Sequence, residues 1–221
     1  MTNSIPLLRH GERLGRDAFE RRYEKTPDVR AELMDGIVYV MSSRVTVPHA
    51  VSHFDLIGLM GAYCVPTPGI AGCVGGTVRL SAECEPQPDV SLRILESHGG
   101  QSRIDEDYFI AGAPEMIAEI SYESLNYDTD IKRPIYEREG VREFILWRVE
   151  DQIVDWYVLR DGTYELLVPD ENGIVRSEIF PGLWMHAEAM ARRDMGAVAR
   201  VLQQGLASAE HAEFVRKLAV A

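Results

Sequence analysis

The sequence lacks any uninterrupted apolar run of about 18 residues, the length that a membrane-spanning helix requires. An apolar stretch within residues 1–17 is too short for a secretion signal, and charged residues follow it at once. We therefore expect a cytoplasmic protein without a membrane segment. The 221 residues, 46% of them hydrophobic, suit one large globular domain.

Cysteine is also scarce, because the chain contains only Cys64, Cys73 and Cys84. An odd number argues against a disulfide framework, and the spacings match no zinc-binding pattern. These residues are expected to be small thiols that are buried or partly buried.

Positive charge is in short supply, with 23 Lys and Arg against 35 Asp and Glu and a net charge of -12. Proteins that bind nucleic acid without regard to sequence are usually basic, so the balance argues against such binding. It is compatible with a local basic groove and with a metal site built from carboxylates.

The spacing of apolar residues predicts a mixed α/β fold in which strands outnumber helices in the middle of the chain. Asp35-Gly36 stands between two apolar runs and predicts a β-hairpin over residues 31–41. Helices are expected near residues 17–23, 49–63, 131–139 and, once or twice, within 187–221. Strands are expected at residues 76–82, 88–95, 115–121, 141–149, 153–160 and 164–168.

Acidic residues at two predicted strands, with a lysine close behind, indicate a metal-dependent hydrolytic site. Asp89 follows Pro88 at the start of one strand, and Glu119 lies inside an apolar one. An acid in such a run is costly unless it is paired or binds a cation. Lys132 opens the following helix and Asp128 precedes it by four residues. Phosphodiester hydrolysis needs a metal held by hard oxygen ligands and a cation near the attacking water.

An ordered set of motifs carries a resemblance to a known family. The chain reads AELMDGIVYVM at 31–41, His49, QPDVSL at 87–92, GAPEMIAEIS at 112–121, YDTDIKRPIY at 127–136 and GVREFILWRV at 140–149. In order and spacing, over roughly residues 20–185, this resembles the Uma2 family of restriction-endonuclease-like proteins, within the PD-(D/E)XK nucleases. Each motif is weak alone, whereas the ordered set is specific.

The resemblance implies a restriction-endonuclease-like α/β (α+β) core, a mixed central β-sheet flanked by helices, with an N-terminal hairpin and a C-terminal helical addition. It divides the chain into a nuclease domain, residues 1–186, and a helical extension of that domain, 187–221. The implied function is a metal-dependent endonuclease that uses Mg²⁺ or Mn²⁺ to cleave nucleic acid, with DNA as the expected partner.

The resemblance also implies roles for individual residues. Asp89 and Glu119 correspond to the metal ligands. Lys132 corresponds to the lysine of the (D/E)XK motif, which in this family lies on the helix after the strand rather than on the strand itself. Ser121 occupies the usual lysine position. Glu32 corresponds to an accessory acid, and His49 matches a histidine that is frequent in the family. Asp128 is a further accessory candidate. In a departure from the family pattern, Ile37 rather than Glu follows Gly36.

Each candidate also has a structural interpretation. Asp89 can serve as a turn cap, Glu119 as a buried ion-pair partner and Lys132 as a solvated helix residue. His49 and Asp128 can simply begin helices. Four arginines near Lys132 form either a phosphate-facing strip or a solvated face paired with acids, namely Arg133, Arg138, Arg142 and Arg148.

Two other functions fit parts of the sequence. Arg9-His10-Gly11-Glu12 and the later His98 resemble the motifs of histidine phosphatases, in which a histidine accepts the phosphoryl group. That interpretation lacks a good buried strand before His10. The third possibility is a binding module with weak or no cleavage.

A homodimer is expected only because it is the commonest assembly of small soluble proteins.

Overall fold

The computed structural model describes residues 6–26, 29–42, 44–122 and 124–220. The beginning of the N-terminal segment considered above, residues 1–5, lies outside the described residues. Within the described ranges, no helix is long and apolar enough to cross a membrane.

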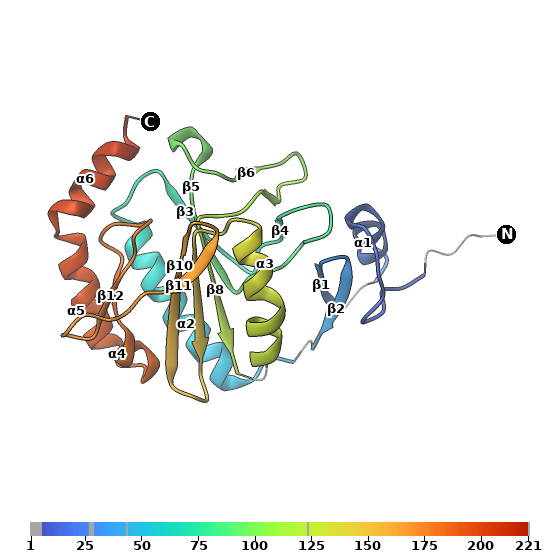
Figure 1. Cartoon of the computed structure of the whole chain (residues 1–221), viewed down its shortest axis with the longest axis horizontal. Helices are drawn as coiled ribbons and strands as arrows, with labels where there is room; N and C mark the ends of the chain where they lie inside the picture. Colours follow the sequence, from blue (N-terminus) through green and yellow to red (C-terminus); the bar gives the residue numbers. More distant parts are fainter. Residues whose placement is uncertain (1–5, 27–28, 43, 123, 221) are drawn as a thin grey trace.

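A six-stranded mixed sheet forms the centre of the molecule (Figure 1). Its order is β11-β10-β9-β8-β5-β3, and β8 and β9 are its one parallel pair among the described strands. The strands are β3 (Ile70–Val74), β5 (Val90–Ile94), β8 (Met116–Ser121), β9 (Glu143–Arg148), β10 (Ile153–Arg160) and β11 (Thr163–Leu166). The predicted mixed central sheet is thus confirmed.

The two faces of this sheet are covered by different helices. Successive side chains of a strand point to opposite faces. Ala118 and Ile120 of β8 accordingly pack in the larger core with α2 (Val47–Cys64), whereas Ile117 packs in a second core with α3 (Arg133–Arg138). Glu119 therefore emerges on the α3 face, which fixes where the acid of this buried strand lies.

The N-terminal hairpin forms a small lobe with its own core. It consists of β1 (Arg30–Met34) and β2 (Ile37–Met41), which pack against α1 (Arg16–Tyr23). Asp35 and Gly36 both have positive φ, as a tight hairpin turn requires, so the sequence signal there was correct. This lobe lies at the opposite end of the molecule from the C-terminal helices (Figure 1).

Several short strands were not foreseen. β4 (Val78–Arg79), β6 (Arg103–Ile104) and β7 (Ile110–Ala111) form one small sheet, and β12 (Ile174–Arg176) and β13 (Trp184–His186) form another. The strand predicted over residues 76–82 shrinks to β4, because the chain bends back at residues 81–84.

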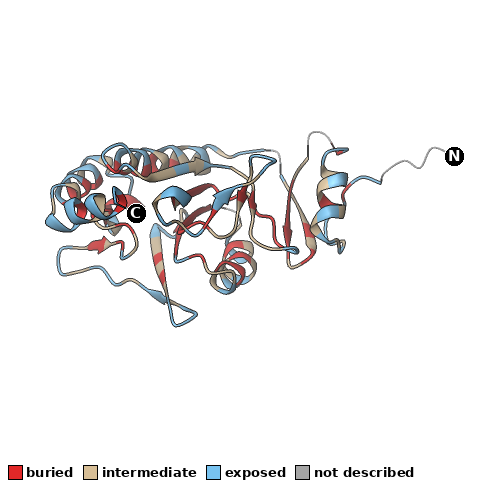
Figure 2. Ribbon diagram, turned by 90° about the horizontal axis from the view of Figure 1, so that it is seen from above, coloured by how far each residue is buried: buried red, intermediate tan, exposed pale blue. Residues whose placement is uncertain are grey.

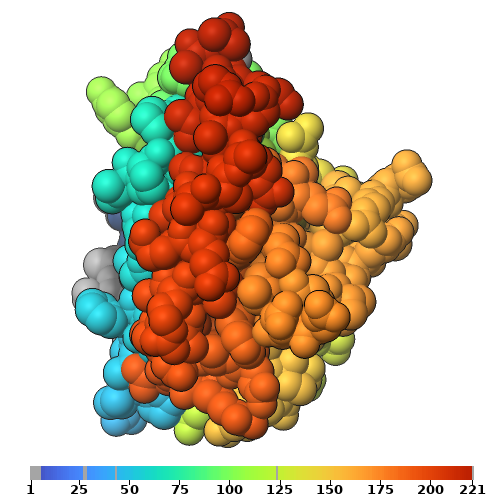
Figure 3. Space-filling model, turned by 90° about the vertical axis from the view of Figure 1, so that its left-hand side faces the viewer, coloured from blue at the N-terminus to red at the C-terminus, as the bar shows by residue number. Residues whose placement is uncertain are grey.

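The C-terminal segment contains three helices, where one or two were expected: α4 (Ala187–Ala191), α5 (Met195–Leu206) and α6 (Ala209–Leu218). Asp194 and Ser208 interrupt the run, since each caps the helix that follows it. Met190, Val198 and Leu202 belong to the same core as α2. Figure 3 shows these helices running across one face of the molecule beside α2.

The buried residues lie between the sheet and the helices that cover it. Figure 2 shows buried residues in the strands and on the inward sides of the helices, with exposed residues around the outside. Trp147 and Trp156 are both buried on the α2 face. The three cysteines are unbridged, and Cys84 is fully buried, as expected.

Candidate active site

Strand pairing brings two of the predicted acids together. In the antiparallel β5–β8 pair, Val90 lies opposite Ala118, so the next positions outward are Asp89 and Glu119. The Asp89 main-chain N–H donates to Oε2 of Glu119 at 3.3 Å. The Asp89 carboxylate in turn accepts a hydrogen bond from the Ile120 N–H at 2.8 Å. The sheet itself therefore positions both carboxylates.

Lys132 reaches this pair from the helical segment after β8. A π-helical turn, Tyr127–Lys132, leads directly into α3. Pro134 follows, and because proline has no N–H and its ring crowds the preceding turn, a widened turn is compatible with it. Lys132 Nζ donates to Glu119 Oε1 at 2.9 Å. Lys132 therefore contacts Glu119 of β8, although the lysine itself lies on the helical segment.

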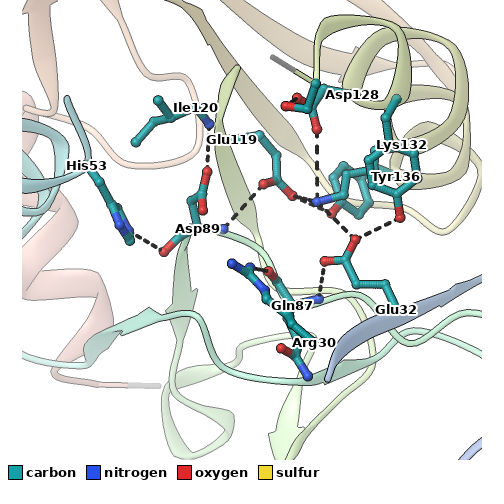
Figure 4. A network of polar contacts seen from close by, with 12 residues as sticks. Arg30, Glu32, His53, Gln87, Asp89, Glu119, Ile120, Asp128, Lys132 and Tyr136 are labelled. Carbon is teal, nitrogen blue, oxygen red and sulfur yellow. Dashed lines mark hydrogen bonds and ion pairs between the residues drawn. The ribbon is translucent and has the colours of Figure 1, made fainter. Parts of the chain in front are cut away.

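The hairpin supplies the third acid. Glu32 of β1 is fully buried, and its Oε2 lies 3.3 Å from Lys132 Nζ. Its Oε1 accepts a hydrogen bond from the Gln87 N–H at 2.8 Å. Figure 4 shows Glu119 and Lys132 between Asp89 on one side and Glu32 on the other. The N-terminal lobe is therefore part of the site.

Two tyrosine hydroxyls complete the cluster. Tyr127 donates to Glu32 Oε2 and Tyr136 donates to Glu119 Oε1, each at 2.7 Å. Tyr136 follows Lys132 by four residues, so both face the sheet from one side of the helix. Asp128 precedes Lys132 by four residues, with its Oδ1 4.0 Å from Lys132 Nζ.

Two histidines of α2 approach Asp89 from the opposite face. His49 Nε2 lies 3.3 Å from Asp89 Oδ2, and His53 Nε2 lies 2.9 Å from the Asp89 carbonyl oxygen. His49 and His53 are four residues apart on one side of the helix. The hydrogen bonds described for the Asp89 carboxylate both go to Oδ2, so its Oδ1 is the atom available to a cation.

The charges in this cluster do not balance. Four buried carboxylates, those of Glu32, Asp89, Glu119 and Asp128, surround one ammonium group. Burial, with the neighbouring acids, raises the pKa of Glu119 above its usual value, against the lowering effect of Lys132. The four acids keep the pKa of Lys132 raised even though burial lowers it, so the lysine is charged.

Asp89 behaves differently from Glu119. Burial alone raises the pKa of its carboxyl group, but the hydrogen bond from His49 and the charge of Lys132 outweigh burial, so the pKa is lowered. Asp89 is therefore ionised near neutral pH and can bind a cation.

The carboxylates beside Lys132 offer oxygen ligands that suit a divalent cation. Within the described part of the chain, no three His, Cys, Asp or Glu side chains are grouped as ligands of one ion. Mg²⁺, however, usually takes only one or two protein carboxylates and keeps several waters. Asp89 and Glu119 meet that requirement, and the excess of buried negative charge favours a cation beside them.

The predicted site residues are thus brought together, because Asp89, Glu119, Lys132 and Glu32 form one contact network and His49 joins it through Asp89. Asp128 lies in the first turn of the π-helical segment, two residues after Asn126 at its N-cap, so it is near the start of the helix and also faces Lys132. Its buried carboxylate accepts a hydrogen bond from the Ser124 hydroxyl at 2.5 Å.

The arginines near Lys132 do not form a strip that faces phosphate. Arg138 pairs with Asp35 and Glu139, and Arg148 pairs with residues 151 and 155. Arg133 lies against the ring of Tyr157. These contacts support the alternative interpretation, in which the arginines form a largely solvated face and pair with acidic residues.

The two histidines of the phosphatase interpretation lie apart. His10 packs against Tyr39 of the hairpin, and its Nδ1 accepts a hydrogen bond from the Val40 N–H. His98 ends a short 3-10 helix, Glu96–His98, where its ring lies close to Gly69. In Figure 1 these segments lie on different parts of the molecule, so they do not form one phosphoryl-transfer site.

Sequence reasoning gave no role to Tyr127, Tyr136 or His53. A signal for Tyr136 existed in the D-x-x-x-K-x-x-x-Y spacing of residues 128–136, which places three polar side chains on one side of a helix. Tyr127 gave no such signal, since only the widened turn brings its hydroxyl to Glu32.

The sequence matches the family described as "Uma2: Putative restriction endonuclease" over residues 16–189. The chain belongs to the Uma2 family. The match contains Glu32, Asp89, Glu119 and Lys132. No curated protein matches the chain. Among solved structures, the chain is similar to a "putative nuclease belonging to DUF820" from Anabaena variabilis ATCC 29413.

That likeness has a TM-score of 0.54 at 15% sequence identity and covers 82% of this chain and 97% of the other. At such low identity it shows the fold alone. Uma2 membership and this fold together confirm a restriction-endonuclease-like protein with a mixed sheet and flanking helices. The Uma2 match ends inside α4, so α5 and α6 lie beyond it.

Proposed function

We propose that this protein is a metal-dependent nuclease that hydrolyses phosphodiester bonds, with DNA as its substrate. One observation carries the proposal: two acidic residues of adjacent strands, Asp89 and Glu119, lie side by side, and Glu119 pairs with the ammonium group of Lys132 in a cluster with excess negative charge. Membership of a family described as "Putative restriction endonuclease" supports it.

The residues divide the chemistry between them. Asp89 and Glu119 would hold Mg²⁺ or Mn²⁺, which would supply a Lewis acid for the phosphoryl oxygen and lower the pKa of water. Lys132 donates hydrogen bonds to the attacking water and stabilises negative charge that develops on the phosphoryl group. Glu32 and Tyr136 orient Lys132 and Glu119 through the contacts described above.

Calorimetric titration with Mn²⁺ tests the metal site directly. Binding is expected in the unaltered protein and is expected to disappear in Asp89→Asn, which keeps the size of the side chain and removes its charge. Asp151→Asn is the matched control, because Asp151 is a half-exposed acid that pairs with Arg148. Loss of binding in both variants, or in neither, would contradict the assignment.

Cleavage tests the function itself. Supercoiled, linear and single-stranded DNA are incubated with the protein and Mn²⁺, and Glu119→Gln and Asp89→Asn are expected to abolish cleavage while circular dichroism stays unchanged. If the protein binds Mn²⁺ but cleaves no nucleic acid, the binding-module alternative replaces the nuclease proposal. The proposed homodimer stays a prediction that light scattering can measure.

A further inference from the structure

A groove runs along the hairpin beside the candidate active site and has two compartments. The first, of about 600 Å³, is lined by aromatic and apolar side chains that include His10, Tyr39, Tyr127 and Ile131. We call it the aromatic compartment. The second, of about 150 Å³, is lined by Arg30, Arg44 and His49, among others, and we call it the basic compartment. Residues 41, 42 and 124 line both, so the compartments adjoin each other.

Both compartments touch the catalytic cluster. Tyr127, in the wall of the aromatic compartment, donates to Glu32, and Lys132 Nζ lies 5.2 Å from the centre of its ring. His49, in the wall of the basic compartment, contacts Asp89. A molecule that fills the groove therefore lies against Tyr127 and His49, which in turn contact Glu32 and Asp89.

The aromatic compartment offers ring faces and edges in a connected set. The rings of Tyr39 and Tyr127 lie 4.7 Å apart, and His10 meets Tyr39 edge to face at 5.6 Å. Nδ1 of His10 accepts the Val40 N–H, so in the neutral ring the proton is on Nε2. A volume of this size suits a planar heterocycle. Asp130 adds a carboxylate to the wall, which suits amino groups and repels phosphate.

The basic compartment, in contrast, favours a phosphate group. Arg30 holds the Gln87 carbonyl oxygen through Nη2, and no ion pair with a described residue engages Arg30 or Arg44. In a chain with a net charge of -12, two such arginines beside a histidine mark a local place for phosphate. The compartment that suits a base and the compartment that suits a phosphate are therefore adjacent.

We propose that this groove binds one unpaired nucleotide of the substrate strand, with its base in the aromatic compartment and its phosphate in the basic compartment. The proposal rests on the proposed nuclease function and adds a substrate class. A base that occupies the aromatic compartment cannot remain stacked and paired in a duplex. The protein therefore prefers single-stranded or locally unpaired DNA over intact duplex.

The test is the binding of fluorescein-labelled 20-nucleotide DNA, followed by anisotropy, with the strand presented single, as a duplex, or with several abasic positions. Single-stranded DNA is expected to bind more tightly than duplex. Tyr39→Leu, which keeps apolar bulk but removes the ring, is expected to weaken single-strand binding about tenfold or more and to leave abasic DNA unaffected. Arg44→Ala is expected to weaken both.

Matched controls keep the result interpretable. Tyr39→Phe keeps the ring and should bind like the unaltered protein, with melting curves to confirm the fold of each variant. Tyr108→Leu and Arg192→Ala change an exposed aromatic and an exposed arginine on other elements, and both should bind normally. Equal binding of duplex and single strand, or no effect of Tyr39→Leu, would overturn the proposal.

Failure of the two proposals can be told apart. If Tyr39→Leu weakens single-strand binding but no metal gives cleavage, the groove stands and the nuclease proposal fails. If DNA is cleaved and Asp89→Asn abolishes cleavage, but Tyr39→Leu cuts and binds every substrate normally, the nuclease stands and the groove proposal is wrong.

Discussion

Lys132 is the single ammonium group among the four buried acids, and its identity matters as much as its charge. The chain uses twenty arginines and only three lysines. A guanidinium group is planar and long, whereas an ammonium group is compact and can donate in three directions. Lysine therefore suits a position between Glu119, Glu32 and Asp128 that arginine does not.

Removing this ammonium group is expected to be costly. Lys132→Met leaves buried acids without their cation and should lower the free energy of unfolding by about 3–5 kcal/mol. Glu119→Gln should cost only about 1 kcal/mol, because the amide oxygen still accepts from Lys132 and Tyr136 and one acidic charge is gone. Urea unfolding measures both. Equal losses would contradict the charge imbalance described for the cluster.

A buried acid away from the site, Glu143, predicts a dependence of stability on pH. Glu143 starts β9 and accepts hydrogen bonds from the Ser177 hydroxyl, the N–H groups of residues 178 and 179, and Trp156. Burial raises its pKa to about 7, although these hydrogen bonds lower it. The folded protein thus holds this proton more tightly than the unfolded chain.

The stability that the Glu143 proton contributes is complete below about pH 4.5 and is lost as pH rises to about 7. The loss is roughly 3 kcal/mol for a shift of this size. Urea unfolding at pH 5 and pH 8 should show a smaller difference for Glu143→Gln than for the unaltered protein. Parallel behaviour of the two proteins would show that Glu143 does not cause the dependence.

At the scale of elements, helix α5 approaches the loop before β13 so closely that only glycine fits at the contact. A methyl group on Gly205 would overlap the Gly182 carbonyl oxygen and come within 2.8 Å of Trp184. Gly205→Ala should therefore destabilise the fold by about 1–3 kcal/mol. Gly61→Ala, in an exposed and open position of α2, should stabilise it by about 0.5–1 kcal/mol. Thermal melting should show a lower melting temperature for Gly205→Ala and a higher one for Gly61→Ala.

The elements differ in how far the sequence reveals them. The hairpin and strands β5, β8, β9 and β10 were predicted, because an Asp-Gly turn or a long apolar run marks each. β3 reads IAGCV, with small residues after a Pro- and Gly-rich stretch, so no alternation marks it. β4, β6 and β7 are two residues long, which is too short for any periodicity, and tertiary contacts alone define them.

The candidate site shows the same division. The acids and Lys132 were found because ordered motifs mark them. Tyr127 could not be found, because its role depends on a π-helical turn that Pro134 accompanies, and sequence periodicity assumes a regular helix. The groove was also beyond prediction, since its walls come from the N-terminal segment, the hairpin and two helices.

At the scale of the whole molecule, the C-terminal helices belong to the main core rather than to a separate unit. Met190, Val198, Leu202 and Leu218 all pack in the core that covers the α2 face of the sheet. A chain that ends at residue 186 should therefore lose cooperative unfolding and bind hydrophobic dyes. Calorimetry and dye fluorescence measure this, and an unchanged melting transition would show that residues 187–221 are dispensable.

The scarcity of lysine gives the buried ammonium group a chemical signature. Lys25 and Lys217 are exposed, whereas Lys132 is buried among its acids. An amine-acylating reagent will therefore modify the two exposed lysines quickly and Lys132 only when the cluster opens. The slow mass increment reports the opening rate of the site, without any knowledge of the substrate.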